Sequence, residues 1–381
     1  MTRVAIHPEL LRWARERARL STLELETKFP RLAEWEDKKQ LPTLKQLEAY
    51  ARATRTPIGY LFLSKPPEEP LPIPDFRTMA GRNIMRPSPD LLDTIYTCQE
   101  RQSWYGEFAQ VTGQPALGFV GSVTTNAATV EVAARMRQTL GFDLDARRDC
   151  PTWTEALRRF VEQADRAGIL VMVSGVVRNN NHRRLDPEEF RGFALVDARA
   201  PLVFINGADT KSAQMFTLAH ELAHIWLGQS AVSDAQASLV PEHQVERWCN
   251  QVAAELLVPL EVLRDEYDRH AGLGNETLRL ARRFKVSTLV ILRRIHDTGG
   301  LTREQLWEAY EAELQRLRAL PKGSGGDFYL TLGARASKRF ARALVVSTLE
   351  GRSSFTEAFR LLEFKKMATF RDLGHSLGVG F

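Results

Sequence analysis

The chain has 381 residues, of which 44% are hydrophobic, and a formal net charge of +5. This length and composition allow two or three domains with substantial cores. The start, MTRVAIHPELL, lacks the apolar core of a secretion signal, and no apolar run approaches the length of a membrane span. The three cysteines are far apart and show no CxxC spacing. These features argue against a membrane protein or a disulfide-stapled secreted protein, and we expect a cytoplasmic one.

Positive charge gathers at the two ends of the chain. Residues 1–65 and residues 322–381 each carry a net charge of +5, so the segment between them carries −5. Basic ends beside an acidic body would allow contact with nucleic acid, but a modest excess of this kind also suits an ordinary solvated surface. Charge alone leaves both interpretations open.

Residues 1–64 predict a small helical domain that resembles the XRE-type helix-turn-helix family. The resemblance rests on the helical patterns from Glu9 to Leu63, on Trp35-Glu36, on Pro42-Thr43 before a helix, and on the closing Tyr60-Leu61-Phe62. The interval between Ser21 and Trp35 is about four residues shorter than in that family, so about one turn of the recognition helix is missing. We therefore expect docking on a protein surface, a partner or the rest of this chain, rather than base-specific DNA binding.

Residues 65–80 form a linker with five prolines in KPPEEPLPIPDFRT. Such a segment is extended and stiff, so it either spaces the first domain from the rest or lies along the rest as an arm. The next domain, residues 81–270, begins with helices. We predict them at 90–111, with an aromatic stripe that suits a core, at 124–140, with a threonine cap, and at 153–167. Apolar, β-prone runs then predict a strand in 168–177 and a hairpin in 190–206.

The stretch His220-Glu221-Leu222-Ala223-His224 lies in a predicted helix, Ser212 to Leu227, which Gly228 would end. Residues four apart share a helix face, so both imidazoles can bind one zinc ion while Glu221 acts as general base. Chance would place such a motif in about one chain of this composition in a hundred. The motif therefore predicts a zinc peptidase site, of the gluzincin-like type.

Catalytic zinc usually takes three protein ligands, so a further ligand is needed downstream. The best candidate is Glu246, in the predicted helix 243–259, ahead of His243 and Glu242. Asn250 lies one helical turn after Glu246 and could orient a ligand. The alternative is that Glu246 is a solvated helix carboxylate.

HELAH followed by E-x-x-C-N-Q-x-A-A-E-L-L-V-P resembles the ImmA/IrrE family of bacterial zinc metallopeptidases, in detail over residues 200–300 and in general plan from residue 120. The resemblance implies one catalytic zinc held by His220, His224 and Glu246, with Glu221 as the base. It also implies regulatory cleavage of DNA-binding repressors in stress-response or mobile-element switches. Cys249 replaces a more usual small residue, which hardly affects the chemistry. Tyr267 and His270 are our candidates for stabilising the oxyanion.

Residues 271–320 predict a bihelical unit and a further helix. Two apolar helix patterns meet at Lys285-Val286-Ser287, with Ser287 as a cap and arginines nearby. This unit either packs under the peptidase or contacts DNA or a repressor. A Gly-rich hinge follows at 321–326, within the last domain, 321–381, which we predict to be basic and α-rich. Its residues Arg335, Lys338, Arg339 and Arg342 fall at helical spacing, as a solvated face or a phosphate-binding face.

The sequence thus predicts an α+β fold that is mostly helical, with a small sheet beside the metallopeptidase helix and helical domains at both ends. The predicted function is zinc-dependent endoproteolysis of one protein partner, a repressor or an antitoxin. The main alternative is a weakly catalytic or non-catalytic zinc protein that acts as an antitoxin or transcription regulator by binding protein or DNA. A third alternative is a transcription factor that binds DNA through its basic ends.

Overall fold

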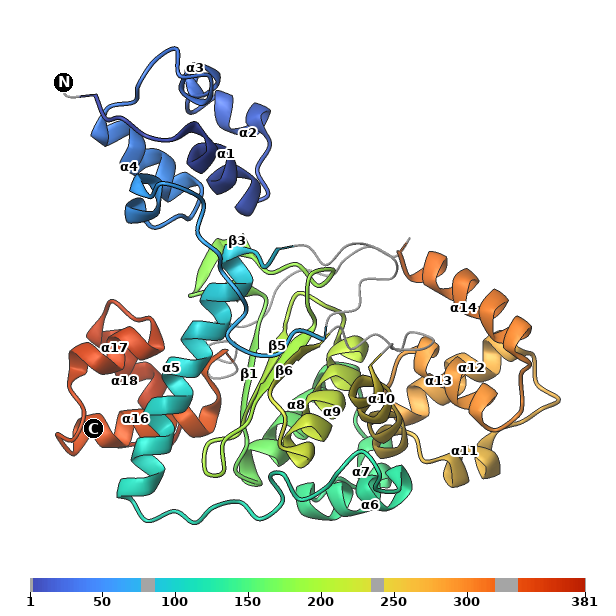
Figure 1. Cartoon of the computed structure of the whole chain (residues 1–381). Helices are drawn as coiled ribbons and strands as arrows, with labels where there is room; N and C mark the ends of the chain where they lie inside the picture. Colours follow the sequence, from blue (N-terminus) through green and yellow to red (C-terminus); the bar gives the residue numbers. More distant parts are fainter. Residues whose placement is uncertain (1–2, 77–85, 234–242, 319–334, 381) are drawn as a thin grey trace. The chain divides into compact units, whose positions relative to one another are not determined.

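The computed structural model describes residues 3–76, 86–233, 243–318 and 335–380 (Figure 1). The chain divides into two compact units, the first formed by residues 1–72 with 81–96 and the second by residues 73–80 with 97–381. Within the described residues, no helix is both long enough and apolar enough to cross a membrane. Glu242 and the hinge at 321–326 lie outside the described residues.

The first unit is helical. Its elements are α1 (Pro8–Arg17), α2 (Thr22–Glu26), α3 (Leu32–Glu36), α4 (Leu44–Ala53) and the 3-10 helix η1 (Ile58–Phe62). Ser21 and Thr43 cap α2 and α4 through reciprocal hydrogen bonds with the third helical residue, which satisfies exposed backbone N–H groups. The core packs around Trp35 and Tyr50, whose hydroxyl donates to the Leu11 carbonyl at 2.8 Å. Helix α3, which ends with Trp35-Glu36, has five residues, little more than one turn.

The second unit is built on a four-stranded mixed sheet in the order β1-β5-β4-β6. The strands are β1 (Leu170–Ser174), β4 (Gly192–Leu195), β5 (Leu202–Asn206) and β6 (Ala231–Ser233). β1 pairs with β5 in parallel, whereas β4 is antiparallel to both β5 and β6. The predicted strand and hairpin are therefore confirmed. A separate two-stranded ribbon, β2 (Val176–Val177) and β3 (Asn180–Arg184), and the short β6 were not predicted.

Helices surround this sheet and carry most of the apolar core (Figure 1). They are α5 (Pro89–Val111), which begins in the first unit, α6 (Thr129–Leu140), α7 (Leu144–Arg148), α8 (Trp153–Arg166), α9 (Lys211–Leu227), α10 (Gln244–Leu257) and α11 (Leu260–Glu266). α9 packs on β4 and β5, and α10 packs between α9 and α6. α6 begins later than predicted and has no side-chain cap, so the expected threonine cap near residue 124 is wrong.

The bihelical unit packs under the peptidase region, which was the first of the two interpretations of its sequence. It comprises α12 (Leu273–Phe284) and α13 (Thr288–Asp297), with Ser287 capping α13 as predicted, and α14 (Arg303–Arg318) packs on α13. Arg282 of this unit is exposed, but two other arginines bond within the protein: Arg283 pairs with Glu266, and Arg293 pairs with Asp297. These side chains are therefore committed to internal ion pairs rather than presented for phosphate.

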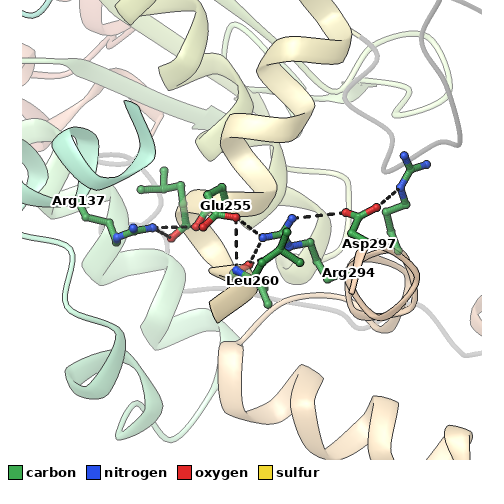
Figure 2. Close-up of polar contacts among 8 residues, drawn as sticks. Arg137, Glu255, Leu260, Arg294 and Asp297 are labelled. Atoms are coloured by element: carbon green, nitrogen blue, oxygen red, sulfur yellow. Dashed lines mark hydrogen bonds and ion pairs between the residues drawn. The ribbon is translucent and has the colours of Figure 1, made fainter. Parts of the chain in front are cut away.

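A buried polar junction ties this pair to α10 (Figure 2). Glu255, near the end of α10, forms an ion pair with Arg294 of α13, and both side chains are about 5% exposed. Arg294 also donates to the Val258 carbonyl at 2.7 Å, and Arg137 of α6 donates to the Glu255 carbonyl at 2.8 Å. The junction thus joins helices from three parts of the sequence.

The C-terminal region is helical, as predicted, with α16 (Lys338–Leu349), α17 (Phe355–Leu362) and α18 (Met367–Ser376). Three of its four predicted basic side chains contact other parts of the second unit, whereas Arg342 is exposed. Arg335 donates to Asn179 at 3.0 Å, Lys338 pairs with Glu162 at 3.0 Å, and Arg339 donates to the Tyr105 hydroxyl at 2.6 Å. Arg335 lies before α16, so the four predicted residues do not share one face of that helix.

Candidate metal centre

Helix α9 fixes the two histidines of the site. It contains no glycine or proline, the Thr210 hydroxyl accepts the Ala213 N–H at 3.3 Å, and Gly228 ends the helix in the left-handed conformation at φ 71°. Every residue from Gln214 to Leu227 is buried, because one face packs on the sheet and another on α10. His220 and His224 lie one turn apart and face α10, from which the third side chain comes.

Three ligand atoms converge between α9 and α10. The Nε2 atoms of His220 and His224 are 3.2 Å apart. Each lies close to a carboxylate oxygen of Glu246, at 3.1 Å from His220 and 3.0 Å from His224. Within the described residues, these three side chains form the one cluster of buried histidine, cysteine or carboxylate groups able to hold a metal ion.

The spacing of these atoms fits zinc. Ligand atoms about 2.0–2.1 Å from a tetrahedral ion lie about 3.3 Å apart, close to the separations seen here. The set of two imidazoles and one carboxylate is a usual donor set for catalytic zinc, and it leaves a fourth position open for water. The two imidazoles also outweigh the effect of burial on Glu246 and hold its pKa well below the usual range. The carboxylate is therefore ionised, as a ligand must be.

Glu221 lies beside this cluster in an apolar setting. It is fully buried, and neither carboxylate oxygen makes a hydrogen bond of normal geometry within the described residues. Burial raises its pKa to about 8, with Glu246 adding to the rise and His220 and the Ser233 hydroxyl opposing it. Gly192 of β4 leaves the space that the Glu221 side chain needs. A methyl side chain at position 192 would lie 3.2 Å from Glu221 Cγ and 2.8 Å from the Phe204 carbonyl oxygen.

Two residues near the site were missed by the sequence analysis. Ser233, the last residue of β6, has its hydroxyl 3.5 Å from His224 Nε2. Phe76, from the proline-rich segment, stacks on the His224 ring at a centroid distance of 6.3 Å and an interplanar angle of 25°. Both depend on strand pairing at the sheet edge, for which three-residue strands give no periodic signal.

Comparison with known proteins identifies the domain in which the cluster lies. Residues 164–296, which include the whole cluster, match the IrrE N-terminal-like domain. This domain belongs to the ImmA/IrrE family. The mostly helical α+β architecture predicted from the sequence agrees with it. Residues 336–376 match a domain of unknown function (DUF8813).

Two curated relatives cover parts of the chain. The radiation response metalloprotease IrrE of Deinococcus radiodurans is 35% identical over 96 residues, 24% of this chain and 29% of the relative. That of Deinococcus deserti is 35% identical over 167 residues, 40% of this chain and 59% of the relative. The chain thus spans less than two thirds of each of these relatives. No solved structure matches the chain.

The other candidates of the ImmA/IrrE domain lie apart from the cluster. Tyr267 is the C-cap of α11, and burial raises its pKa. His270 is exposed, in the turn after α11. His243 precedes α10, exposed, and is not in the cluster. Cys249 is buried on α10, where burial raises its thiol pKa, so it stays protonated. None of the described contacts joins Tyr267 or His270 to the three ligands.

Asn250 makes the contact that orients His220 in the ImmA/IrrE site, since its Oδ1 lies 2.9 Å from His220 Nδ1. This bond places the N–H on Nδ1 and leaves Nε2 free to bind zinc. We expect Asn250→Ala to weaken zinc binding about 10- to 100-fold, measured by competition with a chelator of known affinity. Gln251→Ala, at the exposed next position, is the control. Equal affinities of the two variants would show that the bond does not tune the site.

Proposed function

We propose that this protein is a zinc-dependent endopeptidase that makes regulatory cuts in one protein partner, a transcriptional repressor or an antitoxin. The observation that carries the proposal is the buried His220, His224 and Glu246 cluster with Glu221 beside it. A structural metal site needs no further buried carboxylate beside its ligands. A hydrolytic site needs such a carboxylate as the general base. The regulatory context rests on the family and on the radiation response named for the two relatives.

The mechanism assigns a role to each side chain of the cluster. Zinc, when bound by His220, His224 and Glu246, supplies Lewis acidity that polarises the scissile carbonyl and acidifies water. Glu221 takes the proton of the attacking water and delivers it to the leaving amine nitrogen. Its burial keeps bulk water away and leaves its oxygens free for this proton transfer. Asn250 holds the tautomer of His220 throughout.

Selectivity would come from docking outside the site. Helix α3, which ends with Trp35-Glu36, has only five residues, and the arginines of the helix pair and the C-terminal region are largely engaged within the protein. Neither feature favours reading of DNA bases. We therefore propose that the first unit binds protein, which would restrict cleavage to the docked partner. We also propose a cytoplasmic location, where such repressors act.

The deciding experiment is co-expression with the repressor or antitoxin encoded beside the gene, followed by mass spectrometry of the partner. Two defined fragments, absent when Glu221 is replaced by glutamine, would support the endopeptidase. An intact partner in a stable complex with the zinc-loaded protein would overturn it in favour of a binding protein. Salt-sensitive DNA binding that survives His220→Ala would instead favour a transcription factor.

A further inference from the structure

The edge of the sheet next to the metal site is covered by the chain's own linker. We define the strap as residues Ile73–Phe76, which lie in the second unit together with the sheet. Asp75 pairs in parallel with Val232 of β6. The Val232 N–H donates to the Pro74 carbonyl at 2.9 Å, and the Phe76 N–H donates to the Val232 carbonyl at 3.0 Å. The strap is thus a short added strand.

Val232 is the residue of β6 that turns its backbone polar groups outward. Along an edge strand, the backbone N–H and C=O groups of successive residues point alternately to the neighbouring strand and to the open side. Those of Val232 bond to the strap. The Ser233 carbonyl bonds on the other side, where it accepts the Arg191 N–H just before β4. Without the strap, one donor and one acceptor of Val232 would be open at the sheet edge. An open edge of this kind accepts an extended peptide by strand addition.

This edge leads directly to the metal centre. Ser233 follows Val232 in β6 and has its hydroxyl 3.5 Å from His224 Nε2. The Phe76 ring stacks on His224 and lies 5.2 Å from the ring of His243, at the start of α10. A peptide seated on Val232 would therefore pass beside the ligands. The strap covers one side of the site with an aromatic ring.

We propose that the Val232 edge is the docking strand for an extended segment of the protein substrate, and that the strap holds this edge in a self-occupied state. The inference rests on the proposed endopeptidase function and deepens it. The substrate must offer an unpaired, extended stretch of at least three residues, with a carbonyl in the place of Pro74. It must also offer an N–H in the place of Phe76, so proline is excluded there.

The strap also indicates which side chain suits that position. Phe76 is partly buried between two imidazole rings, a setting that favours a large apolar or aromatic side chain. The strap and the substrate compete for the same backbone groups. The apparent affinity for substrate is therefore the intrinsic affinity multiplied by the fraction of molecules whose edge is free. Weakening the strap therefore raises that fraction.

The test uses the zinc-loaded full chain with Phe76→Ala. We expect amide exchange at Val232 and the rate of zinc loss to excess EDTA each to rise roughly tenfold, as one side of the site opens. Phe355→Ala, which removes an exposed phenylalanine at the start of α17, is the matched control. Phe76→Leu keeps an apolar side chain and should fall between wild type and alanine, and it gives the same comparison if the alanine variant does not fold. Unchanged exchange and zinc loss in the Phe76 variants would overturn the proposal.

Cleavage of the co-expressed partner separates this inference from the proposed function. Faster cleavage by Phe76→Ala than by Phe355→Ala and the wild type, with faster amide exchange, supports both. Faster exchange and zinc loss without cleavage by any variant would confirm that the strap covers the site. The same result would overturn both substrate docking on the Val232 edge and the endopeptidase function. Cleavage at one rate by all variants, with exchange unchanged, would overturn the strap alone.

Discussion

Replacing Glu221 by glutamine is expected to lower the rate of partner cleavage about 10²- to 10⁴-fold while zinc binding is retained. Glutamine has nearly the shape of glutamate, so the packing against Gly192 and the three ligand side chains stays in place. The amide cannot accept the proton of the attacking water, and this step is the one removed. Cleavage is followed by the rate of fragment formation, and zinc by elemental analysis of the purified variant.

The same chemical change at a distant carboxylate provides the control. Glu304 on α14 is exposed, so Glu304→Gln should cleave at the wild-type rate. A Glu221→Gln variant that cleaves as fast as Glu304→Gln would contradict the role of Glu221 as base. A variant that loses zinc as well would show that Glu221 supports the metal site, and the proposed division of roles would then fail.

The sequence predicts long, periodic elements well because their signals are local. α9 and α10 are apolar at regularly spaced positions, and α9 is also capped by Thr210 and Gly228, so both helices were expected close to their observed bounds. The same spacing places His220 and His224 on one face and brings Asn250 into line with Glu246. The hairpin of β4 and β5 was found because two apolar runs flank a polar turn.

The failures concern contacts between distant parts of the sequence. α6 begins at Thr129 rather than near Thr124 because the preceding segment is tied to α9 and α10. The Val123 N–H donates to the Trp226 carbonyl at 3.2 Å, and Trp248 donates to the Ala127 carbonyl at 3.1 Å. Likewise, β6 pairs with β4 beyond the whole of α9, and the strap pairs with β6 across more than 150 positions, which no local pattern records. Ser233 and Phe76 reach the site by this route.

The contacts of the basic side chains in the C-terminal region could not be predicted from the sequence. The sequence gives the spacing of the arginines and lysines but not what faces them. Three of the four predicted residues bond to side chains of other elements of the second unit, namely Asn179, Glu162 and Tyr105. A basic helix pattern is therefore compatible with internal docking as well as with a solvated or phosphate-binding face.

Replacing Arg294 by alanine is expected to lower the free energy of unfolding by about 3–5 kcal/mol. Arg294 and Glu255 are both buried, and removing the guanidinium leaves the Glu255 carboxylate without its charged partner (Figure 2). The Val258 carbonyl would also lose the N–H groups that Arg294 donates, at 2.9 Å and 2.7 Å. The Leu260 N–H, 3.4 Å from the carboxylate, could not compensate. Urea unfolding followed by circular dichroism measures the change.

Arg293→Ala is the matched control, because the neighbouring guanidinium pairs with Asp297 at a more exposed position. That change should cost less than about 1 kcal/mol, as for surface ion pairs. Replacing both buried partners, as Glu255→Leu with Arg294→Met, should recover much of the loss, since no charge is then left buried alone. Equal losses for Arg294→Ala and Arg293→Ala would show that the junction contributes little.

Weakening the junction is also expected to affect the metal site. Glu255 lies on the same helix as Glu246, and the junction fixes the end of α10 against α6 and α13. Loosening that end is expected to let Glu246 and Asn250 move relative to α9, so Arg294→Ala should also bind zinc more weakly at temperatures where it remains folded. Unchanged zinc affinity in the folded variant would mean that packing of α10 on α9 suffices to place both side chains.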